Sequence, residues 1–107
     1  MTPRTFEEMC LTLQEECMAI MVERQAAYGP QNISRLGVPG TLVRIQDKLA
    51  RLEHLLGDGY SEAAAEGLPL DPAIEDSLID LSNYCDIMRA QLRGWWTADH
   101  CPPLAST

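Results

Sequence analysis

The chain has 107 residues, 46% of them hydrophobic, and a formal net charge of −8 at pH 7. This length fits one small domain with a modest core. The acidic balance argues against a nucleic-acid backbone as partner, because such binders usually present a basic surface. No apolar run reaches the roughly 18 residues of a membrane span, and the N-terminus lacks the apolar segment of a signal peptide. We therefore expect a cytoplasmic protein that binds neither membranes nor nucleic acids.

The first predicted helix covers about residues 5–27. Thr5 and Glu8 form a capping box at its start, and apolar residues follow at helical spacing up to the Tyr28-Gly29-Pro30 break. A second apolar line runs along nearly the opposite side and consists of Leu11, Met18 and Val22. One three-helix core cannot cover both faces, and an apolar face outside the core commonly marks an interaction surface. The pattern predicts a homo-oligomer, a dimer or a tetramer.

Two kinds of charged residue on this helix are candidates for function. Arg24 falls within the apolar seam near the end of the helix, and an inward-facing charge needs a partner. Its partner is either an internal carboxylate, the more common case, or a phosphate of a ligand. Glu16 lies on the flank of the seam and is a candidate metal ligand, although a charged residue at the edge of the core is again more common.

Residues 28–40 contain three glycines and two prolines, which predicts a structured turn region. Thr41 then caps a second helix over residues 42–56. The core face of this helix consists of Leu42, Ile45, Leu49, Leu52 and Leu56. The other face carries a cationic cluster of Arg44, Lys48 and Arg51, and Lys48 is the chain's only lysine. Such a cluster suits phosphate oxygens, or it forms salt bridges with Asp47, Asp76 or Asp80.

A surface segment with a short helix near residues 61–66 leads to a third long helix over residues 72–93. Asp71 is its N-cap and Pro72 occupies the first helical position. The predicted core face consists of Ile74, Leu78, Leu81, Cys85, Met88 and Leu92. A second line lies far round the helix from this face and consists of Asp76, Asp80, Asn83 and Ile87. Cys10, Cys17 and Cys85 are expected to be buried, reduced thiols. We expect a single all-α domain over residues 1–96 and a loose tail over 97–107.

The acids of that second line need a cation or water around them. Two carboxylates at i and i+4 repel each other by about 0.2–0.5 kcal/mol. A basic side chain would neutralise them, as would Mg²⁺, which prefers oxygen ligands and substrate phosphates. A simple solvated face is the third alternative. The pattern makes Asp76 and Asp80 candidate metal ligands.

Three segments occur in a fixed order: AYGPQNI, then VRIQDKLARLEHL, then EDSLIDLSNYCDIM. Together they resemble the MazG-like all-α nucleoside triphosphate pyrophosphohydrolases, and more closely their phage-associated branch, the nucleotide modification associated domain. The resemblance covers about residues 15–88. It implies a helical homo-oligomer that binds a nucleotide between helices and holds its phosphates through Mg²⁺ with acids from two helices.

The chain departs from the metal-binding motifs of that family. Asp80 matches the final acid of the family's ExxD motif, but Ser77 stands at the Glu position and Asp76 lies one residue earlier. The ExxE motif of the preceding helix is replaced by residues 46–51, QDKLAR, which carry cations where the family has carboxylates. The altered acids favour binding without hydrolysis, whereas the family resemblance favours hydrolysis of a phosphoanhydride, which is the leading hypothesis.

Two functions follow as hypotheses. In the first, Mg²⁺ drives hydrolysis of a (deoxy)nucleoside triphosphate to a monophosphate and pyrophosphate, with Asp76 and Asp80 as catalytic residues. In the second, a non-catalytic phage protein in the host cytoplasm sequesters a host signalling nucleotide or supports base modification. A scaffold without a ligand is a third class. The candidate nucleotide-binding residues are Arg24, Arg44, Lys48, Arg51, Asn83 and Tyr84, and the candidate metal ligands are Asp76, Asp80 and Glu16.

Overall fold

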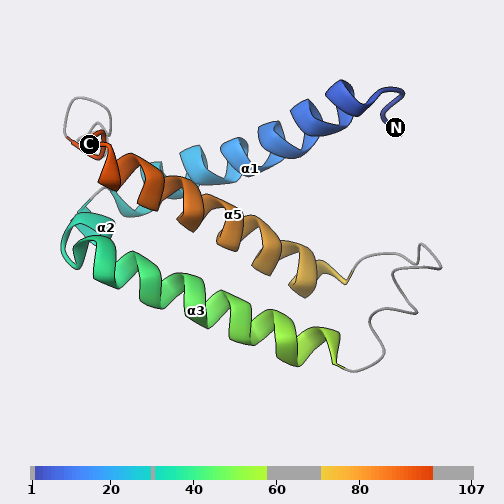
Figure 1. Cartoon of the computed structure of the whole chain (residues 1–107). Coiled ribbons are helices and arrows are strands. Elements are labelled where there is room, and N and C mark those ends of the chain that lie inside the picture. Colours follow the sequence, from blue (N-terminus) through green and yellow to red (C-terminus); the bar gives the residue numbers. More distant parts are fainter. Residues whose placement is uncertain (1, 30, 58–70, 98–107) are drawn as a thin grey trace.

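The structure, a computed structural model, describes residues 2–29, 31–57 and 71–97. It contains the helices α1 (Phe6–Tyr28), α2 (Gln31–Ser34), α3 (Gly37–Leu56) and α5 (Pro72–Leu92) (Figure 1). The all-helical prediction is confirmed, with three long helices and no strand in these ranges. The predicted helix near 61–66 and the tail from residue 98 onward lie outside the described residues. No helix in the described ranges is long and apolar enough to cross a membrane.

The ends of the long helices follow the capping residues of the sequence. The hydroxyl of Thr5 accepts a hydrogen bond of 3.1 Å from the backbone N–H of Glu8, and the carboxylate of Asp71 accepts one of 2.8 Å from that of Ala73. These bonds satisfy donors that have no partner within the helix. Gly29 ends α1 with a φ of 77°, a conformation that favours glycine.

The turn region between the first two predicted helices is more helical than expected. It contains α2, and α3 begins at Gly37 instead of residue 42. Pro39 is tolerated there because the first turn of a helix has no donor to lose. Thr41 is not an N-cap: it is 2% exposed, and its hydroxyl donates to Oε1 of Gln91 at 2.8 Å. The prediction was wrong because the hydroxyl connects α3 to α5 instead of capping its own helix.

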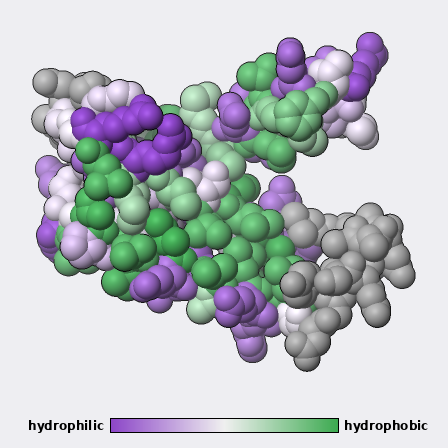
Figure 2. All heavy atoms as spheres, viewed as in Figure 1, coloured by the Kyte–Doolittle hydropathy of each residue, from purple (hydrophilic) through white to green (hydrophobic). Residues whose placement is uncertain are grey.

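α3 and α5 pack side by side along their length, whereas α1 meets α5 only through its C-terminal half (Figure 1). The N-terminal half of α1 projects away from the other helices, and Figure 2 shows open space beneath it. α1 accordingly has no fully buried residue. Its exposed apolar side chains include Phe6, Leu11, Leu13, Met18 and Val22.

The predicted core face of α5 is wrong. Leu78 and Leu92 are 45% and 70% exposed, and Cys85 is also exposed. The buried residues of α5 belong to the polar side: Ser77, Asp80, Asn83 and Ile87. On α3 the predicted core face is wrong only in part: Leu42 and Leu49 are exposed, whereas Leu52 is buried as predicted. The physical reason is that cations from α1 and α3 pair with the polar side of α5, so this side faces its neighbours.

Candidate functional site

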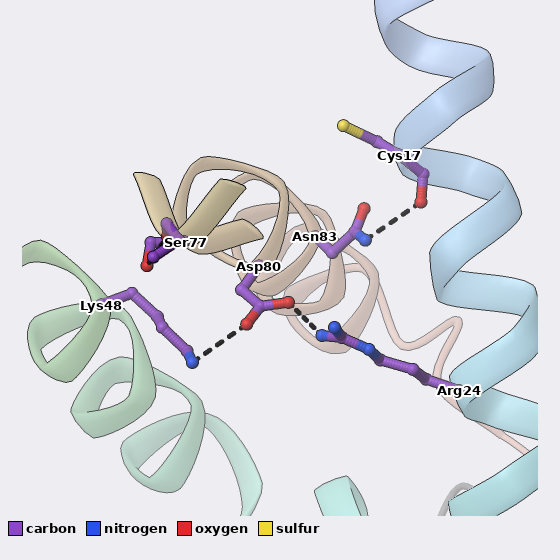
Figure 3. Close-up of polar contacts among 7 residues, drawn as sticks. Cys17, Arg24, Lys48, Ser77, Asp80 and Asn83 are labelled. Carbon is purple, nitrogen blue, oxygen red and sulfur yellow. Dashed lines mark hydrogen bonds and ion pairs between the residues drawn. The ribbon is translucent and has the colours of Figure 1, made fainter. Parts of the chain in front are cut away.

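Asp80 stands at the meeting point of three helices. It is 8% exposed, and both of its carboxylate oxygens contact cations: Oδ1 accepts from Nη1 of Arg24 on α1, and Oδ2 lies 2.9 Å from Nζ of Lys48 on α3 (Figure 3). A carboxylate this buried needs such partners, because an unpaired buried charge is very costly. The internal ion pair expected for Arg24 is confirmed, as is the one across to Lys48.

Asn83 makes the second polar link between α5 and α1. Its Nδ2 donates to the backbone carbonyl of Cys17 at 3.0 Å (Figure 3). Asn83 follows Asp80 by one helical turn, so both side chains fall on the same side of α5. Ser77, one turn before Asp80, is also buried, and its hydroxyl donates to the carbonyl of Ala73 within the helix.

A cavity of about 350 Å³ lies beside this ion cluster. Its lining combines three chemical types. The charged residues are Arg24, Arg44, Lys48 and Asp80; the amides are Gln25, Asn32 and Asn83; the aromatic residues are Tyr28, Tyr84 and Trp96. Met21, Ile33 and Ile87 supply apolar surface. Cationic, amide and aromatic groups around one hollow of this size are typical of a site for a small polar ligand with a flat ring.

A second, more open hollow adjoins the cavity. It is lined by Arg44, Asp47, Lys48, Arg51 and Tyr84. Three of these residues, Arg44, Lys48 and Tyr84, line both hollows. The guanidinium of Arg44 lies over the ring of Tyr84 at 5.8 Å from its centroid, an attractive cation–π arrangement. Arg44 and Tyr84 thus form part of a wall between an inner cavity and an outer basic surface.

The charge of the cavity is opposite to that of the chain. Three cations line it against one carboxylate, and that carboxylate is already paired with two of them, whereas the whole chain carries −8. The local positive charge attracts an anionic ligand to the cavity, whereas the acidic remainder of the chain repels it. The charge of the cavity is therefore suited to phosphate.

Six of the predicted site residues come together here: Arg24, Arg44, Lys48, Asp80, Asn83 and Tyr84 line the inner cavity. Arg51 lines only the outer hollow. Asp76 and Glu16 are exposed and line neither of them, although both were predicted as metal ligands and Asp76 also as a catalytic residue. Within the described residues, Asp80 alone supplies a carboxylate to the inner cavity.

The residues present do not fit a Mg²⁺ ion held by the protein. Magnesium is usually bound through one or two carboxylates that still have oxygens to give, but both oxygens of Asp80 are engaged by Arg24 and Lys48. No group of three His, Cys, Asp or Glu side chains gathers in the described ranges. The Mg²⁺ prediction stays a prediction.

Sequence reasoning missed part of the cavity lining, namely Gln25, Tyr28, Asn32 and Trp96. Tyr28 and Asn32 belong to the AYGPQNI segment, which was interpreted as a turn and as part of the family resemblance without a site residue. Gln25 follows Arg24 directly, so the two share one end of α1. Trp96 comes after the end of α5 and no periodic pattern could have placed it.

Comparisons with protein-family models, with curated proteins and with solved structures gave no match.

Proposed function

We propose that the protein binds a nucleotide in the inner cavity. Arg44 and Lys48, which also line the outer hollow, contact its phosphates. The aromatic residues of the lining pack against the base. Arginine forks and the lysine ammonium are the usual partners of phosphate oxygens. The proposal agrees with the resemblance to MazG-like proteins, which rests on sequence motifs alone.

The observation that carries the proposal is the charge reversal at the cavity. A structural ion cluster needs only as many cations as acids, yet this lining has three cations for one carboxylate. Arg44 pairs with a ring and not with an acid among the contacts of the described residues. The excess charge sits in a hollow that also offers amides and aromatic surface, so an anion with a flat polar ring fits all three groups together.

Binding without hydrolysis accounts for the residues better than hydrolysis does. Asp80 matches the family's last metal ligand, but its oxygens are used in the ion pairs with Arg24 and Lys48. Asp76 lies outside the lining, so the cavity has no second carboxylate among the described residues to hold a metal or activate a water. Hydrolysis of a phosphoanhydride remains the alternative outcome of the experiment below.

The experiment incubates purified protein with a pool of ribo-, deoxy- and cyclic nucleotides plus Mg²⁺. The filtrate and the compounds released from denatured protein are then chromatographed separately. Recovery of an intact nucleotide from the protein fraction supports the proposal. Conversion of a triphosphate to its monophosphate supports the hydrolase alternative. An unchanged pool with nothing retained contradicts both and supports a helical scaffold.

A further inference from the structure

Two amide atoms in the cavity lining are buried without a hydrogen-bond partner among the described residues. Asn83 is 6% exposed, and its Oδ1 accepts no hydrogen bond. Gln25 on α1 has a buried Nε2 that donates none. A buried polar atom without a partner destabilises the folded chain, and such atoms are rare in native proteins. Both residues line the same cavity, so a bound ligand can supply the missing partners.

The orientation of Asn83 is fixed by its other contact. The carbonyl of Cys17 can only accept, so the amide must direct Nδ2 toward α1 (Figure 3). Oδ1 is therefore left as an acceptor, and the group that pairs with it must be a donor. A phosphate oxygen accepts hydrogen bonds and cannot fill this role. Neither can a carboxylate, so Asn83 selects a part of the ligand other than its anionic group.

We infer that Asn83 and Gln25 bind the hydrogen-bonding edge of a nucleobase. Oδ1 of Asn83 accepts from an N–H of the base, and Nε2 of Gln25 donates to a neighbouring ring nitrogen or carbonyl oxygen. Proteins recognise unpaired bases through this combination of edge hydrogen bonds and aromatic stacking. Tyr28, Tyr84 and Trp96 in the same lining provide aromatic surface for the base.

The inference rests on the proposed function and gives the cavity two ends. Arg44 and Lys48 bind the phosphates and are shared with the outer hollow, whereas Gln25 and Asn83 belong to the inner cavity alone. The base accordingly lies toward α1 and the phosphates toward the outer hollow. A sugar phosphate without a base would use the phosphate end and leave the two amides unpaired.

The test is Gln25→Met, which keeps the length of the side chain and removes its amide. Binding of AMP, GMP, CMP and UMP is measured by calorimetry beside binding of ribose 5-phosphate, which lacks a base. We expect the tightest nucleotide to bind about 3- to 10-fold more weakly to the variant, the loss of one neutral hydrogen bond. Ribose 5-phosphate should bind equally to both proteins. Gln46→Met, at an exposed position of α3 outside both linings, is the control and should change neither affinity.

A stability measurement separates this role from a purely structural one. Because the Nε2 of Gln25 has no partner in the ligand-free chain, Gln25→Met should leave the unfolding midpoint unchanged or raise it. An equal loss of affinity for ribose 5-phosphate and nucleotide, or no loss at all, overturns the inference while leaving nucleotide binding intact. If neither a nucleotide nor ribose 5-phosphate binds the unaltered protein, the proposed function falls and the inference falls with it.

Discussion

The inward side of α5 and the outward side of α1 distribute polarity in opposite ways. Toward its neighbours α5 presents Ser77, Asp80 and Asn83, whereas α1 presents Leu11 and Met18 to solvent. A helix of a soluble protein usually buries its apolar residues and exposes its polar ones. Buried polar groups between helices mark a site, and exposed apolar groups mark a surface that another molecule covers. The first region is the basis of the proposed ligand site, and the second is the basis of the predicted contact with another copy of the chain.

The largest expected effect concerns the apolar side of α1. We expect the protein to be a dimer or larger at micromolar concentration, and Leu11→Glu combined with Met18→Glu to make it monomeric. Charges placed at the centre of an apolar contact lose their hydration without gaining a partner. Light scattering after size-exclusion chromatography gives the mass. Thr12→Glu, exposed on another side of α1, should leave the assembly intact. A monomeric unaltered protein would contradict the expectation.

The next effect tests the ion cluster on the inward side. Asp80→Ala leaves Arg24 and Lys48 without their carboxylate and should lower the free energy of unfolding by about 2–3 kcal/mol. This loss is smaller than the one expected when a partner is removed from a fully buried ion pair, because both cations here are partly exposed. Asp86→Ala on the same helix removes an exposed ion pair of 3.5 Å with Arg89 and should cost less than about 0.5 kcal/mol. Urea unfolding measures both losses. Equal losses would show that the ion pairs of Asp80 stabilise the fold no more than an exposed ion pair does.

A smaller effect separates the inner cavity from the outer hollow. Lys48→Met should weaken nucleotide binding about 10-fold, and Arg51→Met about 2- to 3-fold, because Lys48 lines both hollows and Arg51 only the outer one. Arg89→Met removes one positive charge from an exposed position on α5 and serves as the control. Calorimetry gives the affinities. If Arg89→Met weakens binding as much as Lys48→Met, the attraction is a general charge effect and not a site.

The smallest effect concerns the contact between α3 and α5. Thr41→Val keeps the shape of a buried side chain and removes its hydrogen bond to Gln91, so the free energy of unfolding should fall by about 1 kcal/mol. Thermal unfolding measures this change. Thr12→Val, at an exposed position of α1, should cause little or no loss. An unchanged midpoint for Thr41→Val would show that the bond to Gln91 contributes nothing net.

The sequence was sufficient to predict the helices but not which side of each helix lies inside. Capping residues such as Thr5 and Asp71 act on their own helix, so the starts of α1 and α5 could be predicted from neighbouring residues. The inward side of α5 depends on Arg24 and Lys48, which come from two other helices. Periodicity alone assigns the apolar side to the core, and this rule fails when a second chain or solvent takes that side.

Part of the candidate site could also be predicted from the sequence. Arg24 stood out as a charge within an apolar seam, Lys48 as part of a cationic cluster, and Asp80 as one of two acids at i, i+4 spacing. The structure brings these three residues together. Asp76 shares the i, i+4 spacing with Asp80 but lies one turn away along α5, where it is exposed and lines neither hollow. Gln25 and Trp96 gave no signal, since neither a polar amide near a helix end nor an aromatic residue after one is unusual in a sequence.

The central claim is that the polar side of α5 forms a nucleotide cavity whose positive charge comes from side chains. Equilibrium dialysis of the unaltered protein against the nucleotide retained from the pool, in the presence of EDTA, tests it most directly. We expect one nucleotide bound per chain without a divalent metal, because Arg44 and Lys48 already supply the charge. Absence of binding under any condition, or binding only when Mg²⁺ is restored, would contradict the claim.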